Sequence, residues 1–189
     1  MTYVDDGSSQ FGRSLVAGQA YDSINRFFRV LGRAALDNGN SLTSSQLNPL
    51  EKRLRRVQET ISSVSMHLPA GFAAGLNRQF ANLMDVDAWE DEDKPINDRA
   101  LSAFLVVLLH TGTQVRPGIG TNGYGSITAA WTTAEGQLTV ECLPSGRISF
   151  VMSRLGDDGE VERAAFGPLH PRRLLNVLAP FAPEVWFDG

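Results

Sequence analysis

The chain lacks most of the residues that would point to a specific chemistry. Its 189 residues include one cysteine, Cys142, so no intramolecular disulfide and no thiolate metal cluster can form within the chain. Its three histidines, His67, His110 and His170, are too few and too scattered to predict a metal site. We therefore expect the protein to hold neither a metal nor a cofactor.

Long hydrophobic runs are also absent. The longest apolar run covers residues 103–109, whereas a transmembrane helix needs about 20 such residues. The first residues show neither the basic segment nor the apolar segment of a signal peptide. We therefore expect a cytoplasmic protein with no membrane association. The single cysteine and the frequent Ala, Gly and Arg favour a bacterial or phage source.

The net charge of −4 is unevenly distributed along the chain. Residues 1–82 carry nine Lys or Arg and six Asp or Glu, whereas residues 83–99 carry two and seven. Residues 100–189 carry six and eight, and are therefore close to neutral. The overall charge argues against a general polyanion-binding protein, but a local basic surface remains open.

The spacing of apolar residues changes near Gly112. Before it, apolar residues recur every three or four positions, which is typical of amphipathic helices. Four helices are predicted: from Asp22 or Ser23 to Asn38-Gly39, from Pro49 through Leu68, over residues 72–83 and over residues 95–110. The last is apolar on almost every side, so we expect the other elements to pack upon it. The Leu50–Leu68 stripe fits one face of a helical bundle or a short coiled-coil seam.

After Gly112, apolar and polar residues alternate between glycine turns, as in an antiparallel meander. Three strands are predicted near residues 127–132, 138–142 and 148–153, with a weaker one around Val161. Pro171 then begins a helix that Pro180 ends. The sequence thus predicts an α+β fold: about four helices, a three- to four-stranded antiparallel meander and a C-terminal helix. We expect residues 1–19 to be flexible and residues 20–189 to form one domain, helical over 20–111 and containing the meander and last helix over 112–189.

Residues 118–123 match the dinucleotide-binding pattern G-x-G-x-x-G. That site requires the glycines to follow a strand directly and to open a helix. Here Arg116-Pro117 and further residues separate the pattern from the preceding apolar run, and the segment after Gly123 alternates like a strand. We interpret the pattern as a flexible approach to a hairpin.

Three groups of residues are candidates for binding a partner. The first is an acidic loop that contains Trp89, Asp91, Glu92 and Asp93; it is interpreted as a solvated linker or as a surface for a basic partner. The second is the apolar tail with Trp186 and Phe187, which either packs on the core or docks on a partner. The third comprises two basic helix faces that could contact nucleic-acid phosphates, formed by Arg26, Arg29 and Arg33 and by Lys52, Arg53, Arg55 and Arg56.

Catalytic residues are harder to find. Arg116, His110 and Cys142 are the remaining candidates for a small enzyme, but the alternation places Cys142 on the apolar side of the sheet. His67 and His110 lie near helix carboxyl ends, where the dipole favours a partly cationic ring. The favoured hypothesis is a non-enzymatic interaction module, of an antitoxin, immunity or inhibitor kind, that masks a protein partner or forms a homo-oligomer. Nucleic-acid association and a small enzyme are the alternatives.

Overall fold

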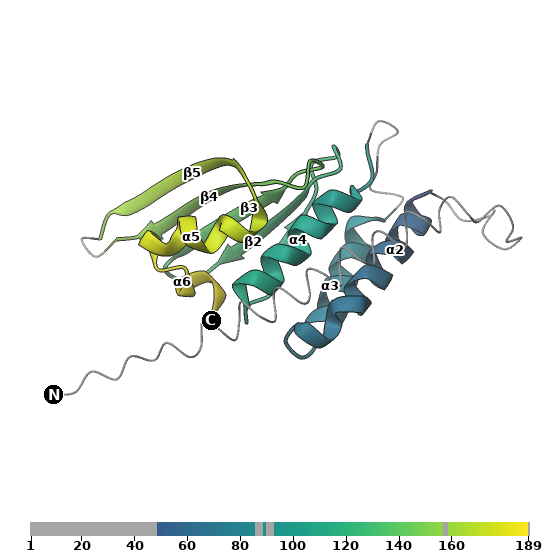
Figure 1. Ribbon diagram of the computed structural model, residues 1–189, viewed down its shortest axis with the longest axis horizontal. Helices are drawn as coiled ribbons and strands as arrows, with labels where there is room; N and C mark the ends of the chain where they lie inside the picture. The colour runs from purple at the N-terminus through teal and green to yellow at the C-terminus, as the bar shows by residue number, and fades with distance from the viewer. Residues whose placement is uncertain (1–48, 86–88, 90–92, 157–158, 189) are drawn as a thin grey trace, which may run out of the picture.

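The computed structural model describes residues 49–85, 89, 93–156 and 159–188, and the structural statements below refer to these residues. Helices come first and a five-stranded antiparallel sheet follows, so the fold is α+β (Figure 1). The helical part comprises α2 (Pro49–Val64), the 3₁₀ turn η1 (Ser65–His67), α3 (Phe72–Leu83) and α4 (Asp98–Thr111). The strands are β1 (Gly118–Gly120), β2 (Ile127–Thr132), β3 (Gly136–Cys142), β4 (Ile148–Leu155) and β5 (Val161–Leu169).

The central helix α4 begins three residues later than predicted. The side-chain oxygen of Asn97 accepts a hydrogen bond from the Arg99 backbone N–H at 2.8 Å, so Asn97 is the N-cap and Pro95 lies outside the helix. Gly112 ends the helix in the left-handed conformation. Nearly every residue from Ala100 to Leu109 is buried, which confirms that this helix is central to the core.

The stripe from Leu50 to Leu68 is one face of a helical bundle. Val57, Ile61 and Val64 are fully buried in the core, where α2 packs against α3. The aromatic rings of Phe80 on α3 and Phe104 on α4 meet edge to face at 5.9 Å. The bundle interpretation of this stripe is therefore the one that the structure supports.

The sheet has five strands rather than three or four. Its order is β1-β2-β3-β4-β5, with each strand antiparallel to its neighbour. The additional strand is β1, which pairs Gly118 with Ala130 and Gly120 with Thr128. The predicted weak strand around Val161 is the nine-residue β5, whose pairing with β4 is irregular between Ile148 and Phe150.

The two faces of the sheet differ. Alternate residues of β2, β3 and β4 are fully buried, including Trp131, Val140 and Met152, and they point toward the helices. We call this the inner face. Figure 1 shows α4, α5 and α6 on the same side of the sheet. None of the described helices covers the opposite side, which we call the outer face.

The predicted C-terminal helix is instead four short helical segments. They are η3 (Pro171–Arg173), α5 (Leu174–Leu178), η4 (Ala179–Phe181) and α6 (Glu184–Phe187). Pro180 lies within η4 rather than ending the helical region, and the left-handed Ala182 breaks the chain direction before α6. The tail then packs on the core, because Trp186 is 0% and Phe187 is 2% exposed.

Two predictions fall outside the described residues: the flexible segment 1–19 and the helix that begins near Asp22. Within the described part of the chain, no helix is long and apolar enough to cross a membrane.

Candidate functional site

The outer face is unusual in how little charge it carries. Of its residues, only Glu141 and Arg163 are charged. A sheet face that only contacts water ordinarily carries many charged side chains, whereas the centres of protein interfaces are depleted of them. The face is made of Thr128, Ala130 and Thr132 of β2, Gln137, Thr139 and Glu141 of β3, Ser149, Val151, Ser153 and Leu155 of β4, and Val161, Arg163 and Ala165 of β5.

An apolar patch lies on the part of the outer face formed by β4 and β5. Val151, Leu155 and Val161 are 56%, 57% and 56% exposed, and Leu155 pairs directly with Val161 across the two strands. Among the described residues, the other large hydrophobic side chains that are exposed are Met66 and Tyr124. Three of the five exposed large hydrophobic side chains in the described residues therefore lie together on one face.

A shallow groove of about 470 Å³ adjoins the patch. Polar and small side chains from all four strands β2–β5 line it, among them Thr128, Thr139, Ser149 and Ala165. Phe150 and Phe166 also line it, and their rings stack with centroids 4.6 Å apart where the β4–β5 pairing is irregular. The Nδ2 of Asn122 donates to Glu141 Oε1 at 3.0 Å, which restrains the carboxylate at the groove.

The structure does not gather the predicted partner-binding residues into one site. Trp89 packs against the core, and its Nε1 donates to the Leu83 carbonyl at 2.7 Å. Trp186 and Phe187 are buried, so they offer no exposed surface in this conformation. Asp93 lies against Gly123. The remaining two acidic residues of this group, Asp91 and Glu92, lie outside the described residues.

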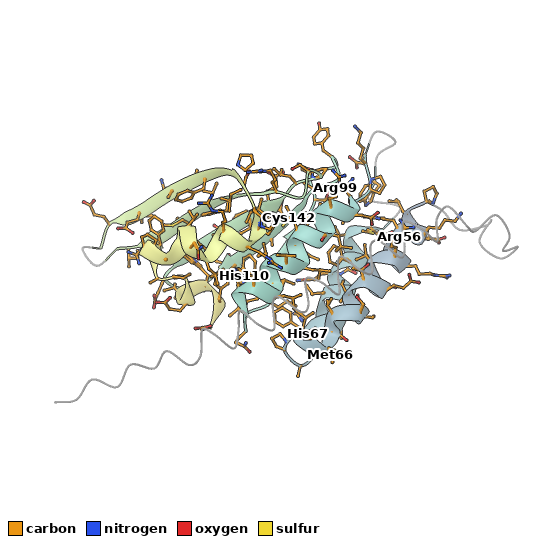
Figure 2. The ribbon with its side chains drawn as sticks, in the orientation of Figure 1. Arg56, Met66, His67, Arg99, His110 and Cys142 are labelled. Atoms are coloured by element: carbon orange, nitrogen blue, oxygen red, sulfur yellow. The ribbon has the colours of Figure 1, made fainter. Side chains whose placement is uncertain are left out.

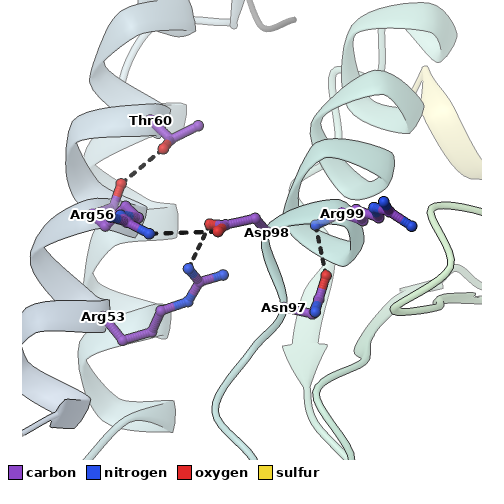
Figure 3. Close-up of polar contacts among 6 residues, drawn as sticks. All are labelled: Arg53, Arg56, Thr60, Asn97, Asp98 and Arg99. Atoms are coloured by element: carbon purple, nitrogen blue, oxygen red, sulfur yellow. Dashed lines mark hydrogen bonds and ion pairs between the residues drawn. The ribbon is translucent and has the colours of Figure 1, made fainter. Parts of the chain in front are cut away.

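One of the two predicted basic surfaces is partly neutralised. Figure 3 shows Arg53 and Arg56 of α2 converging on Asp98 at the start of α4. Arg53 Nη1 is 2.5 Å from Asp98 Oδ1, and Arg56 Nη1 is 3.5 Å from Asp98 Oδ2. Lys52 and Arg55 remain exposed. The other surface, Arg26, Arg29 and Arg33, lies outside the described residues, so nucleic-acid binding stays a prediction.

The G-x-G-x-x-G pattern is part of the sheet and its connecting loop. Gly118 and Gly120 belong to β1, and Gly123 and Gly125 have positive φ angles of 73° and 82°. The Gly123 carbonyl accepts a hydrogen bond from the Lys94 N–H at 2.7 Å, and the Gly125 carbonyl accepts one from the Asn97 N–H at 2.9 Å. The expectation of a flexible lead-in is therefore wrong for Gly118–Gly120. The loop leads into β2, not into the helix that a dinucleotide site requires.

The candidate catalytic residues do not form a site in the described part of the chain. Cys142 is fully buried on the inner face as predicted, and burial raises the pKa of its thiol well above the ordinary value. The Arg116 guanidinium lies across Gly75 of α3. In the residues that the structure describes, no cluster of three or more His, Cys, Asp or Glu is placed to hold a metal.

The expectation of a partly cationic His110 is wrong, although the residue does lie near the end of α4 (Figure 2). Burial lowers the pKa of its imidazole below the ordinary value. A backbone hydrogen bond with Arg172 opposes this shift, and the nearby Arg172 and His170 side chains add to it. Desolvation therefore outweighs the backbone hydrogen bond at this position.

This lowered pKa predicts a pH dependence of stability. Because the folded chain holds His110 less protonated than the unfolded chain, protons bind preferentially to the unfolded state as the pH falls below about 6.5. Stability from this residue is therefore present at neutral pH and lost on acidification. Urea unfolding of the wild type and of His110→Gln at about pH 7.5 and pH 5.5 should show a smaller acid-induced loss in the variant. Equal losses would contradict the prediction.

The outer face was not identified from the sequence, although its low charge was visible in the alternating segments. Alternation separates two sets of side chains but does not say which set the helices leave uncovered. Compared with known proteins, the chain matches no family model, no curated protein and no solved structure.

Proposed function

We propose that this chain is a non-enzymatic protein-binding module, of an antitoxin, immunity or inhibitor kind, that masks a partner with the outer face of its sheet. The observation that carries this proposal is the combination of low charge and exposed apolar side chains on one continuous face. Interface cores have this composition, and monomeric proteins seldom leave such patches exposed without a use.

The occupant we infer is an uncharged ridge on a different protein, polar where it enters the groove and apolar where it covers the Leu155–Val161 patch. The groove beside Val151 is concave, and the Leu155–Val161 patch continues it along β4 and β5. A convex ridge would fill the groove and cover the patch at the same time. A second copy placed across a two-fold axis would bring groove against groove and leave a void between them, so the shape favours a different protein.

The test begins with a photo-reactive amino acid placed at position 151 or, as a control, at position 66. Met66 is an exposed apolar residue of η1, on the helical side of the molecule (Figure 2). A protein that cross-links through position 151 but not through position 66 is then identified, purified and titrated calorimetrically against the unmodified chain.

Val151→Glu and Met66→Glu form a matched pair, because each places a carboxylate at an exposed apolar position. We expect Val151→Glu to weaken binding of the identified partner at least about 30-fold, because it buries an unpaired charge in the interface. Met66→Glu should change the affinity less than about twofold. Equal affinities for the two variants would refute the proposal, as would a wild-type dimer that Val151→Glu converts to a monomer.

Masking requires that binding inhibits the partner. The activity of the identified protein should therefore fall when the wild-type chain is added, and the same concentration of Val151→Glu should leave it unchanged. A partner that keeps its full activity when saturated would contradict the masking role, whatever its affinity.

A further inference from the structure

A small basic pocket lies on the helical side of the sheet, separate from the outer face. It occupies about 140 Å³ between α4, the β3–β4 turn and the start of η3, and Arg99, Ser102, Gly146 and His170 are among the residues that line it. Sites for drug-sized ligands usually enclose about 300–1,000 Å³. A ligand held here is therefore small, or inserts only one functional group.

Three side chains of the lining have hydrogen-bond donors available. Within the described part of the chain, no hydrogen bond or ion pair occupies the Arg99 guanidinium, the Ser102 hydroxyl or the Nε2 atom of His170. His170 Nδ1 accepts the Arg172 backbone N–H at 3.3 Å, so the proton of the neutral ring lies on Nε2, which is a donor. Arg99 and Ser102 belong to α4, and His170 is the N-cap of η3, which packs against α4.

The charge of Arg99 is not neutralised by its acidic neighbour. Figure 3 shows the Asp98 side chain pointing toward α2, where it meets Arg53 and Arg56, and the Arg99 side chain pointing away from it. Among the described residues, no Asp or Glu lines the pocket. Arg172 and Arg173 follow the pocket residue Pro171 along η3. A pocket lined by one sign of charge concentrates the opposite ion.

We infer that this pocket binds a tetrahedral oxyanion, namely inorganic phosphate or the phosphate group of a small monoester. A guanidinium fork matches two oxygens of such an anion, and the hydroxyl and ring N–H can donate to the others. Gly146 brings the β3–β4 turn close to Arg99, because a Cβ added there would be in van der Waals contact with Arg99 Cβ at 3.7 Å. The bound anion joins α4 to η3 and so stabilises the packing of the C-terminal segments on the central helix.

Calorimetric titration with inorganic phosphate and with glycerol 3-phosphate, at constant ionic strength set with chloride, tests this site. We expect saturable binding that Arg99→Ala weakens at least about tenfold. Arg55→Ala is the matched control, since it removes the same charge from an exposed position of α2 and should leave the affinity within about twofold. Tighter binding of the monoester would identify an organic phosphate as the ligand, and equal binding would identify the free anion.

Ser102→Asp provides a second variant should Arg99→Ala unfold. It places a carboxylate in the pocket and should abolish binding, with the circular dichroism spectrum unchanged. Absence of saturable binding to the wild type would overturn the inference, as would an Arg55→Ala variant that loses as much affinity as Arg99→Ala. Because the pocket and the outer face lie on opposite sides of the sheet, either proposal can fail without the other.

Discussion

Trp131→Ala is expected to lower the free energy of unfolding by about 3–5 kcal/mol, a large part of the stability of a small domain. Trp131 is 1% exposed on the inner face of β2, and its ring meets Phe187 of α6 edge to face at 5.3 Å. Removing the indole leaves a large cavity between the sheet and the C-terminal tail. Urea unfolding followed by circular dichroism would measure the loss.

The indole N–H of Trp131 adds a polar contribution. Its Nε1 donates to the Val115 carbonyl at 3.0 Å and to Thr113 Oγ1 at 3.2 Å, so the ring joins β2 to the segment after α4. Thr113 Oγ1 in turn donates to the Val115 carbonyl at 2.7 Å, with the Phe187 carbonyl as a longer second acceptor at 3.3 Å. The Trp131 side chain therefore contacts both the segment after α4 and the C-terminal helix α6.

Trp186 offers a matched comparison for this N–H. Trp186 is also fully buried, but its Nε1 has no hydrogen-bond partner in the described part of the chain. Trp131→Phe should therefore cost about 1 kcal/mol more than Trp186→Phe, because only Trp131→Phe removes hydrogen bonds made by the indole N–H. The cost stays modest because the Val115 carbonyl and Thr113 Oγ1 keep a hydrogen bond with each other. Equal losses in the two variants would mean that packing alone accounts for both.

Local patterns in the sequence predicted the elements whose form depends on local chemistry. The helical spacing from Leu50 onward identified α2, and the all-apolar segment before His110 identified α4 as the central helix. The alternation around Val140 placed Cys142 on the buried face. Each of these features repeats over several residues, so periodicity alone reveals it.

Features set by contacts distant in sequence could not be predicted in this way. Gly118–Gly120 has no alternating pattern and becomes a strand because β2 offers a free edge for pairing. The break at Ala182 likewise depends on where Trp186 must pack. The exposure of the outer face also depends on distant contacts, since the position of the helices decides which face of the sheet stays uncovered. Its low charge could have been read from the sequence, but its exposure could not.

The contact between α2 and α4 is another such feature, because Arg53 and Asp98 are 45 residues apart in sequence. The Arg53 side chain is 12% exposed, whereas that of Asp98 is 40% exposed. The Nε and Nη2 atoms of Arg53 are buried without a hydrogen-bond partner in the described residues, so Asp98 is the carboxylate that compensates this guanidinium there. The pair fixes the start of the central helix against α2.

Asp98→Ala is therefore expected to lower the free energy of unfolding by about 2–3 kcal/mol. The variant leaves the buried Arg53 charge uncompensated and removes a carboxylate from the positive end of the α4 dipole. Removing one partner of a fully buried ion pair costs about 3–5 kcal/mol. The expected loss here is smaller, because water reaches Asp98. Glu59→Ala, at an exposed position of α2, should stay within about 0.5 kcal/mol of the wild type.

A second substitution separates the charge from the packing. Arg53→Met removes the guanidinium and keeps an unbranched apolar side chain, so in the Asp98→Ala background it should restore part of the lost stability. The double-mutant cycle in urea should give a coupling of about 1–2 kcal/mol. A double variant that is destabilised by the sum of the two single effects would show that Arg53 and Asp98 act independently.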